Sequence, residues 1–480
     1  MIRDPRAARL VAAPLLAILL AAGGCFAERS MPVEMSRVTR PTFAAAELGP
    51  APTTRAWVEA VVPRLAPLLP ADANRCLTTR ELLRPDGRPI DVPAAFGLDG
   101  ARLYTLADNL DGLTHTAQAT GPGPGSGASP PWSGFDDILI PVADGLELAA
   151  KFGRAERNGE VAYADCIVVL PGLLGNNNVM RTRDLSFALR DAGWHVLAVE
   201  LRGCGLTDSR QPHVLYNFGV TETGDLLAVD EWLKTHSFVR RTGLIGFCWG
   251  ANHALLAAFE DSRPDQHASI APGLAPLLRP RSGKRHFEAG VLAFSAVLSF
   301  EQTVAQLDTR YSVLENPVLH ALQNTVLARM REKQFPNPNH SLMRLIELES
   351  ERTQGAYPGI VADGLDYLRL APFRGKSDGN KLKTARIPVL LVHGANDPLA
   401  PAQDVANLVA RTDNPNVAAI VLRGGGHVGF APYARDFFYS LVFAFFDPRY
   451  GPAALAPPLL AHSRNDLRNA PDDHDLPRRE

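Results

Sequence analysis

A cysteine flanked by glycines stands where the sequence changes from strand-like to helix-like. Residues 246–250 read GFCWG, and they directly follow the apolar run GLI at residues 243–245. From Trp249 to about Phe259 the chain is rich in Ala and Leu, which favours a helix. A buried strand that turns this sharply into a helix needs small flanking residues and exposes the cysteine at the carboxyl edge of a sheet. The positive end of the helix dipole then favours the thiolate form of Cys248.

Cys248 is either a nucleophile or a buried structural residue, and the partners available to it distinguish the two. The apolar strand predicted over residues 387–394 runs into the turn sequence ANDPLAP, which contains Asp397. The strand predicted over residues 417–422 runs into the glycine-rich sequence RGGGHVGF, which contains His427. Alone, Asp397 is explained as a turn-capping residue and His427 as a surface loop residue. Together with Cys248 they follow the order nucleophile, acid and histidine, each just beyond a strand, which favours a catalytic triad.

The three side chains have complementary roles in acyl transfer. The pKa of a free thiol is about 8.5, so a neighbouring base helps it to react at neutral pH. We expect His427 to take the Cys248 proton as general base and to return it to the leaving group. Asp397 would orient the imidazole and stabilise its cationic form. An acyl-thioenzyme would form and then be hydrolysed by water or passed to another acceptor.

The oxyanion hole is expected from backbone N–H groups near the nucleophile. One donor is the N–H of Trp249, the residue after Cys248. The other should come from the loop that follows an earlier strand. The strand-like residues 166–170 precede the loop sequence PGLLGNNN at residues 171–178. Within that loop the N–H of Leu173 is the expected second donor.

A wider set of motifs carries a family resemblance. Residues 202–205 read RGCG, residues 215–226 read LYNFGVTETGDL, Asn252 follows the GFCWG string, and residues 426–430 read GHVGF. In this order the motifs resemble the YheT-like, ABHD-type subgroup of the α/β-hydrolases over about residues 135–448. The resemblance implies an α/β fold with an eight-stranded, mostly parallel sheet, flanking helices and a helical lid insertion.

Two departures from that subgroup concern the site itself. Its members are esterases, lipases or acyltransferases that act on acyl esters, and they normally carry Ser in the nucleophile motif. The string GFCWG instead looks like dienelactone hydrolase, which uses Cys with Asp and His. The pair before Leu173 is Pro171-Gly172, where the hydrolase pattern usually has His-Gly. We therefore take the fold from the overall pattern and the nucleophile chemistry from Cys248.

The combined pattern predicts an enzyme that cleaves or transfers acyl groups of a carboxylic ester or thioester through a Cys-His-Asp triad. The expected substrate is a small-molecule acyl ester or lipid, and neither a cofactor nor a metal is expected. The alternative is a non-catalytic lipoprotein on a hydrolase scaffold, in which the change from Ser to Cys records lost activity. The presence of both Asp397 and His427 favours the enzyme, since a dead site need not keep them.

The first 24 residues are typical of a lipoprotein signal peptide. Three arginines within the first nine residues precede an apolar run at residues 10–22, and Gly23 and Gly24 lead to Cys25. Small residues after a short apolar segment mark a cleavage site. The run is shorter than the about 20 apolar residues that a membrane span needs. The sequence therefore predicts lipidation of Cys25 and a lipid-anchored protein of the bacterial cell envelope, on the periplasmic side of the outer membrane. Plain secretion into the periplasm or beyond is the alternative.

The charge balance and the cysteine content bear on two further questions, namely whether the protein binds nucleic acid and whether it forms disulfides. The 49 basic and 51 acidic residues nearly balance, and no basic stripe argues for a nucleic-acid partner. An envelope location permits disulfides among Cys76, Cys166, Cys204 and Cys248, but none is expected to be obligatory. Cys204 is explained either as a small residue packed under the site or as a resolving thiol that pairs with Cys248 and stops activity.

More than one compact unit is expected for a chain of 480 residues. Apolar residues at helical spacing predict a helix over residues 57–69 within an N-terminal extension. A helical insertion expected over about residues 300–381 would either cover the pocket as a lid or pack as an ordinary part of the core. The predicted divisions are a signal peptide (1–24), the N-terminal extension (25–119), a Gly/Pro/Ser linker (120–134), the hydrolase domain (135–448) and a flexible C-terminal tail (449–480).

Overall fold

The computed structural model describes most of the chain between residues 53 and 455. The described ranges are 53–71, 75–120, 131–143, 145–263, 270–279, 283–352, 357–370 and 380–455. The predicted signal peptide, Cys25, most of the linker and most of the tail lie outside these residues, and the statements about them remain predictions. Within the described part of the chain, no helix has both the length and the apolar character that crossing a membrane requires.

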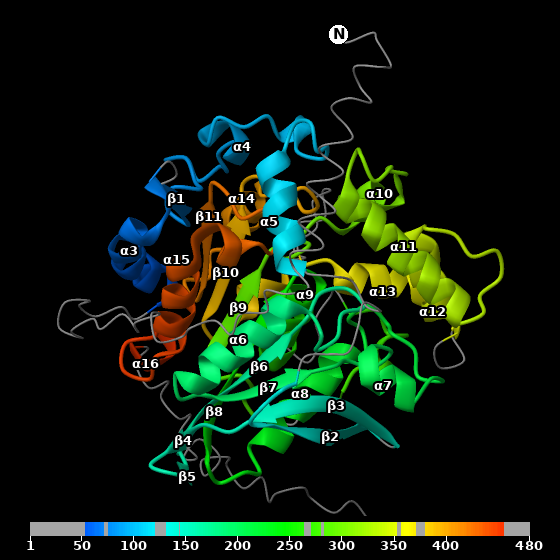
Figure 1. Cartoon of the computed structure of the whole chain (residues 1–480), viewed down its shortest axis with the longest axis horizontal. Helices are drawn as coiled ribbons and strands as arrows, with labels where there is room; N and C mark the ends of the chain where they lie inside the picture. Colours follow the sequence, from blue (N-terminus) through cyan, green and yellow to red (C-terminus); the bar gives the residue numbers. More distant parts are fainter. Residues whose placement is uncertain are drawn as a thin grey trace, which may run out of the picture.

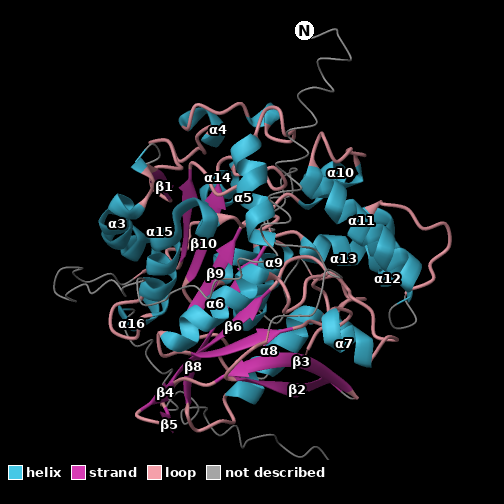
Figure 2. Ribbon diagram, in the orientation of Figure 1, coloured by secondary structure: helices cyan, strands magenta, loops and turns pink. Residues whose placement is uncertain are grey.

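The described residues form one large sheet with the strand order β1-β11-β10-β9-β8-β6-β7-β3-β2 (Figure 2). Strands β7, β6, β8, β9, β10 and β11 run parallel to one another, whereas β1, β3 and β2 are antiparallel to their neighbours. A small ribbon pairs β4 with β5. The strands are β1 (Cys76–Thr78), β2 (Phe135–Ala143), β3 (Leu146–Gly153), β4 (Glu156–Arg157), β5 (Glu160–Val161), β6 (Ala164–Leu170), β7 (His195–Val199), β8 (Val239–Phe247), β9 (Gly290–Phe294), β10 (Val389–Gly394) and β11 (Val417–Leu422).

The mostly parallel sheet flanked by helices confirms the expected fold class, with one strand more than the sequence predicts. Within the described residues, eight strands of the sheet come from the segment after residue 134, and the ninth is β1. Cys76 of β1 pairs with Leu422 of β11, so the N-terminal extension closes one edge of the sheet. The three residues of β1 are too few to show a period of two, so the sequence pattern does not reveal this strand.

Helices cover both faces of the sheet (Figure 1). Along β6, Cys166 and Val168 face one helical layer, and Ile167 and Val169 face the other. The first layer contains α8 (Glu222–Leu233), α9 (Trp249–Ser262) and α14 (Gln403–Ala410), and the second contains α3 (Thr54–Leu65), α6 (Met180–Asp191) and α15 (Phe430–Phe446). The remaining helices and 3-10 turns outside the insertion are α4 (Val92–Ala95), α5 (Leu110–Thr120), α7 (Gly205–Arg210), α16 (Pro452–Leu455), η2 (Ala66–Leu68), η4 (Gly100–Arg102), η5 (Ala275–Leu277) and η6 (Lys381–Thr384).

The helix predicted over residues 57–69 is confirmed as α3, which is followed by the 3-10 turn η2. The helix begins earlier than predicted because Thr53 caps it, its hydroxyl oxygen accepting the N–H of Ala56 at 3.2 Å. Trp57 is fully buried, and its indole N–H donates to the Tyr450 carbonyl at 2.9 Å. Trp57 also belongs to the same apolar cluster as Ile167 and Phe445, so the N-terminal extension shares a core with the hydrolase domain.

The described residues between β9 and β10 are mostly helical, as the sequence predicts for about residues 300–381. Its helices are α10 (Phe300–Asp308), α11 (Pro317–Glu332), α12 (Leu342–Arg352) and α13 (Ile360–Leu368). Buried ion pairs fasten this insertion to α7, since Asp208 lies 3.0 Å from Arg329 and 2.7 Å from Lys333. Leu319 and Leu345 of the insertion belong to the same apolar cluster as one face of the sheet. The insertion therefore packs as part of the core, and its role as a lid remains a prediction.

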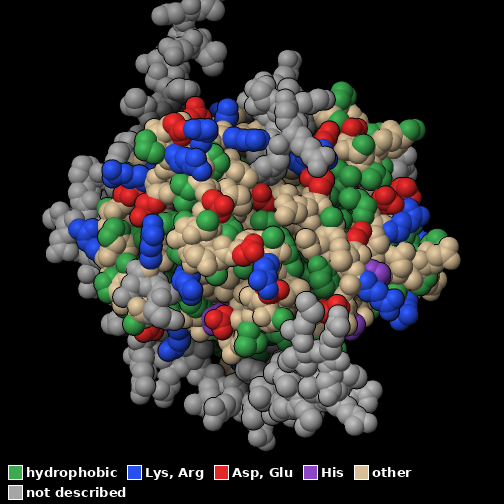
Figure 3. Space-filling model, turned by 90° about the horizontal axis from the view of Figure 1, so that it is seen from above, with side chains coloured by type: hydrophobic (Ala, Val, Ile, Leu, Met, Phe, Trp, Pro, Cys, Tyr) green, Lys and Arg blue, Asp and Glu red, His purple; other side chains and the backbone are tan. Residues whose placement is uncertain are grey.

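Basic and acidic side chains of the described residues are interspersed on the face seen from above (Figure 3). This mixture agrees with the balance of 49 basic and 51 acidic residues in the whole sequence. On that face, the described residues do not form the continuous stripe of basic side chains that nucleic-acid-binding proteins use.

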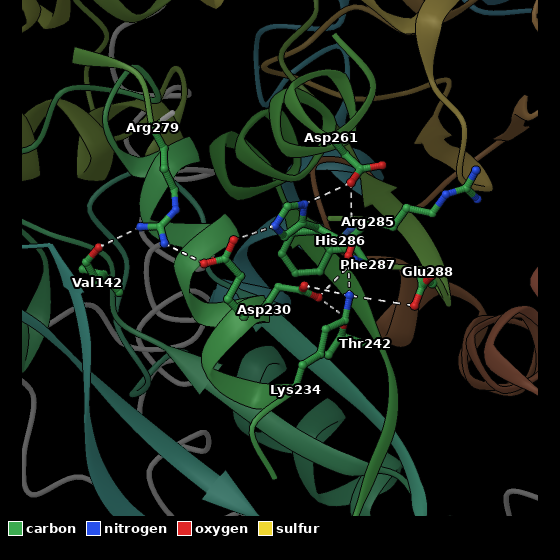
Figure 4. Close-up of polar contacts among 11 residues, drawn as sticks. Val142, Asp230, Lys234, Thr242, Asp261, Arg279, Arg285, His286, Phe287 and Glu288 are labelled. Atoms are coloured by element: carbon green, nitrogen blue, oxygen red, sulfur yellow. Dashed lines mark hydrogen bonds and ion pairs between the residues drawn. The ribbon is translucent and has the colours of Figure 1, made fainter. Parts of the chain in front are cut away.

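A buried histidine ties two helices of one layer to the segment that precedes β9 (Figure 4). The Nδ1 atom of His286 lies 3.0 Å from Asp261 of α9, and its Nε2 atom lies 3.3 Å from Glu231 of α8. Burial would lower the pKa of His286, but the neighbouring carboxylates of Asp261, Asp230 and Glu231 outweigh burial and raise the pKa. Arg279 partly neutralises the cluster, because its guanidinium lies 2.7 Å from Glu231.

The contacts of His286 are expected to stabilise the fold more at low pH than at high pH. A histidine whose pKa is raised by folding contributes fully below its unfolded pKa of about 6.5, and the contribution disappears as the pH rises through the folded pKa. The melting temperature of His286→Gln should therefore fall furthest below that of the wild type at pH values below about 6.5, and this difference should shrink as the pH rises above that value. Thermal unfolding across this pH range measures the difference, with the exposed His213→Gln as control. A difference in melting temperature that stays constant with pH would contradict the view that folding raises the pKa of His286.

Candidate active site

Cys248 lies at the sharp turn between β8 and α9, where the sequence motif predicts it. Its φ of 55° and ψ of −120° belong to a region that residues other than glycine rarely occupy. The flanking glycines are required by packing. A Cβ added at Gly246 would lie 2.3 Å from the Gly250 carbonyl oxygen, and one added at Gly250 would lie 2.1 Å from the Pro171 carbonyl oxygen. The turn is held by the Cys248 N–H, which donates to the Phe294 carbonyl at 2.9 Å.

Asp397 and His427 are brought together from the ends of two neighbouring strands. Asp397 follows β10, His427 follows β11, and Nδ1 of His427 lies 2.9 Å from Oδ2 and 3.1 Å from Oδ1 of Asp397. The N–H groups of Leu399 and Ala400 donate to Oδ1 of Asp397 at 2.8 and 2.9 Å. His393 lies 3.2 Å from Oδ2 through its Nε2 atom. Sequence reasoning missed His393, although it is the polar residue in an otherwise apolar strand.

The Asp397 carboxylate is buried and ionised. Burial would raise its pKa, but the charge of His427 and the hydrogen bond from His393 outweigh burial and hold the pKa well below its usual range. The Nε2 atom of His427 is buried and lies on the side of the ring that Asp397 does not contact. With Asp397 fixed at Nδ1, the Nε2 side of the ring is left to exchange a proton with a nucleophile or a leaving group.

The thiol and the imidazole favour each other's charged forms. Burial raises the pKa of Cys248, but the positive charges of His427 and Arg181 and the N–H of Trp249 outweigh burial and lower the pKa below its usual value. Burial likewise lowers the pKa of His427, but the negative charges of Asp397 and Cys248 outweigh it and raise the pKa to about 10. Between these two pKa values the pair exists as thiolate and imidazolium.

Arg181 is a charged neighbour of the nucleophile that sequence reasoning missed. It lies in the first turn of α6, and its Cζ atom lies 5.0 Å from the centroid of the Phe247 ring. Its Nε and Nη1 atoms are buried and have no hydrogen-bond partner among the described residues. Burial lowers its pKa to about 10, whereas the negative charge of Cys248 acts to raise it. A cation is unfavourable in the first turn of a helix, so the thiolate gives a physical reason for this position.

The loop that carries Leu173 runs beside the nucleophile. A Cβ added at Gly172 would lie 3.1 Å from Cβ and 3.6 Å from Sγ of Cys248, so the loop backbone passes close to the sulfur. The Trp249 N–H forms a hydrogen bond that helps to lower the Cys248 pKa. The two residues expected to supply the oxyanion hole therefore stand on two segments that pass close to Cys248.

The other described cysteines are buried and, like Cys248, free; they are Cys76, Cys166 and Cys204. Burial raises the pKa of Cys204 well above its usual value, which leaves it an unreactive thiol. This favours the explanation of Cys204 as a packing residue over that of a resolving thiol. Among the residues that the structure describes, no group of three or more His, Cys, Asp or Glu side chains is placed to hold a metal ion.

A cavity of about 760 Å³ lies next to the acid of the site. It is lined by Asp397, by Tyr104 of the N-terminal extension, by Gln302 of α10 and by Asp404 of α14. Cys248 is not among its lining residues. The cavity therefore borders the triad on the Asp397 side.

Comparison with known proteins gives the family of this chain. Residues 167–441, more than half of the chain, match the model of the alpha/beta hydrolase family. The chain therefore belongs to the α/β-hydrolases. The matched region contains Leu173, Cys248, Asp397 and His427, whereas α3, β1 and α5 of the N-terminal extension lie outside it. The comparison with curated proteins gave no match.

Several solved hydrolases resemble this chain at low sequence identity. The Pyrococcus furiosus esterase Pf2001 is 17% identical, with 66% of this chain and 92% of that chain covered and a TM-score of 0.39. The Pyrococcus horikoshii acylaminoacyl peptidase is 15% identical, with 65% and 41% covered and a TM-score of 0.39. The 2,6-dihydroxy-pseudo-oxynicotine hydrolase is 14% identical, with 67% and 69% covered and a TM-score of 0.39. Likenesses this distant carry no argument about activity, which rests on the site.

Proposed function

We propose that this α/β-hydrolase cleaves or transfers acyl groups of a carboxylic ester or thioester, with Cys248 as nucleophile. One observation carries the proposal. Cys248, which has a strained backbone conformation and a lowered pKa, shares a buried site with His427, whose Nδ1 atom lies 2.9 Å from Asp397. His427 supplies the positive charge that favours the thiolate, and the sharp turn between β8 and α9 leaves the sulfur at the carboxyl edge of the sheet.

Acyl transfer by this site proceeds in two steps. The Cys248 thiolate attacks the carbonyl carbon, and the N–H groups of Trp249 and Leu173 stabilise the oxyanion of the tetrahedral intermediate. When the intermediate collapses, the bond to the alkoxide or thiolate leaving group breaks, and His427 gives its proton to that group. The neutral His427 then takes a proton from water or another acceptor, which attacks the thioester and releases the Cys248 thiolate.

A panel of p-nitrophenyl esters of rising chain length, with matched thioesters, tests the proposal. We expect saturable turnover of at least part of the panel by the purified protein without its first 24 residues. An iodoacetamide probe should label Cys248, and the labelling should depend on His427. The chain length with the highest kcat/KM would give the size of the acyl pocket. The absence of turnover together with labelling that does not depend on His427 would point to a non-catalytic protein on a hydrolase scaffold.

The proposal also places the enzyme on the bacterial cell envelope through lipidation of Cys25. The short apolar run followed by Gly23, Gly24 and Cys25 supports it. Incorporation of labelled palmitate by the full chain in bacterial cells tests this step, with Cys25→Ser as the matched control. Label in the wild type and its loss in the variant are expected. Equal labelling of both proteins, or labelling of neither, would contradict the anchor.

A further inference from the structure

A helix from outside the matched family region touches the loop that carries the histidine of the triad. In Figure 1, α5 (cyan) lies beside α15, whose first turn follows that loop. The backbone N–H of His427 donates to the Thr116 hydroxyl oxygen at 2.8 Å. The Thr116 hydroxyl in turn donates to the Gly112 carbonyl at 2.6 Å, and Thr116 is fully buried. A buried N–H next to the imidazole is thus satisfied by a side chain of the N-terminal extension.

The residue before α5 reaches the loop of the acid. The Asn109 amide nitrogen donates to the Asn396 carbonyl at 2.7 Å, directly before Asp397. The Asn396 side chain then accepts the N–H of Gly426 at 2.9 Å, directly before His427. Asn109 is buried, and its own amide oxygen accepts an N–H from α5 at 3.1 Å. One continuous set of hydrogen bonds therefore joins the extension to both loops of the triad.

The backbones of α5 and the histidine loop approach so closely that glycine is needed on both sides. A Cβ added at Gly426 would lie 2.0 Å from the Gly112 carbonyl oxygen and 2.6 Å from the Thr116 hydroxyl oxygen. A Cβ added at Gly112 would lie 2.4 Å from the Asn396 carbonyl oxygen. Gly426 also has a φ of 54°, which favours glycine. At this position the glycine-rich sequence makes room for α5.

We infer that the N-terminal extension is a working part of the active site, in which Thr116 and Asn109 are positioning residues for His427 and Asp397. The inference rests on the proposed function. Catalysis depends on the geometry of the thiolate, imidazole and carboxylate, and a displacement of about 1 Å can cost about 100-fold in rate. Without the Thr116 oxygen, the His427 N–H is left unsatisfied in a buried place, and the loop moves to satisfy it. The imidazolium of His427 is then displaced from the position in which it stabilises both the Cys248 thiolate and the Asp397 carboxylate.

The test compares Thr116→Val, which removes the acceptor but keeps the shape, with Thr116→Ser, which restores it. Thr120→Val is the matched control, because Thr120 is an exposed residue of the same helix whose hydroxyl donates to the carbonyls of Thr116 and Ala117. Thr116→Val should lower kcat by about 10- to 100-fold with KM little changed. Thr116→Ser and Thr120→Val should remain close to the wild type.

A second readout does not depend on turnover. The pH at which alkylation of Cys248 by iodoacetamide is half-maximal should move upward in Thr116→Val, because a displaced imidazolium stabilises the thiolate less. Asn109→Asp keeps the acceptor for the Gly112 N–H but loses the donor to the carbonyls of Asn396 and Leu103. It should move both readouts in the same direction as Thr116→Val, and it replaces that variant in the test if Thr116→Val does not fold. Normal kcat and an unchanged alkylation profile in folded variants would overturn the inference. A wild type without turnover would contradict the proposed function instead, and the alkylation profile would still decide the positioning role.

Discussion

Cys248→Ala is expected to lower ester turnover by roughly 10⁴-fold or more, because it removes the thiol that forms the acyl-enzyme. Cys248→Ser should also be strongly impaired, since the site favours an ionised thiol and a serine hydroxyl has a much higher pKa. Initial rates against the best ester of the panel, with intact folding checked by circular dichroism, measure the effect.

The matched control for that experiment is Cys204→Ala. Cys204 is buried and free, and burial raises its pKa, so its removal should leave turnover within about twofold of the wild type. Turnover that survives in Cys248→Ala would exclude the thiol as nucleophile. A similar loss in Cys204→Ala would show that the assay reports on packing near the site.

His427→Ala is expected to remove both turnover and the acidity of the thiol. The loss of the general base and acid should cost roughly 10⁴-fold in kcat/KM. The loss of the imidazolium charge should raise the pKa of Cys248, since that charge is the largest influence lowering it. Alkylation by iodoacetamide at about pH 6 should then slow by at least about tenfold, one pKa unit being a factor of ten. His213→Ala, at an exposed histidine, is the control.

The pKa values of Cys248 and His427 together set the shape of the pH profile of turnover. Turnover should fall on the acid side as Cys248 gains a proton, at a pH below the usual thiol pKa, and on the alkaline side as His427 loses its proton near its pKa of about 10. Alkylation of Cys248 should show the acid limb without an alkaline fall, because it needs the thiolate alone. An alkaline fall in both profiles would mean that the protein itself, rather than His427, changes in that range. Arg181→Met should shift the acid limb upward by a smaller amount than His427→Ala.

The sequence predicts those parts of the site that follow strands of the sheet. Cys248, Asp397 and His427 each come directly after an apolar run, and parallel strands bring their carboxyl ends to one edge. The same reasoning gives the fold class and the helical nature of the segment before β10. These features are local in the sequence, so their patterns can be recognised without knowledge of the packing.

The residues that the sequence does not reveal act through contacts between distant segments. Thr116 meets His427 across 311 positions, and Asn109 meets Asn396 across 287. Arg181 lies near Cys248 because of how α6 packs, and no spacing in the sequence marks it. β1 is too short to show a period, so the ninth strand appears only when it pairs with β11.

The central claim, that Cys248 forms the acyl-enzyme, is tested most directly by the mass of the protein during turnover. The purified enzyme is mixed with its best ester in excess, quenched in acid within the first turnovers, and weighed intact and after digestion. We predict a gain in mass equal to the acyl group, located on the peptide that contains Cys248 and absent in Cys248→Ala. Turnover with no adduct in the wild type, or an adduct on another residue, would contradict it.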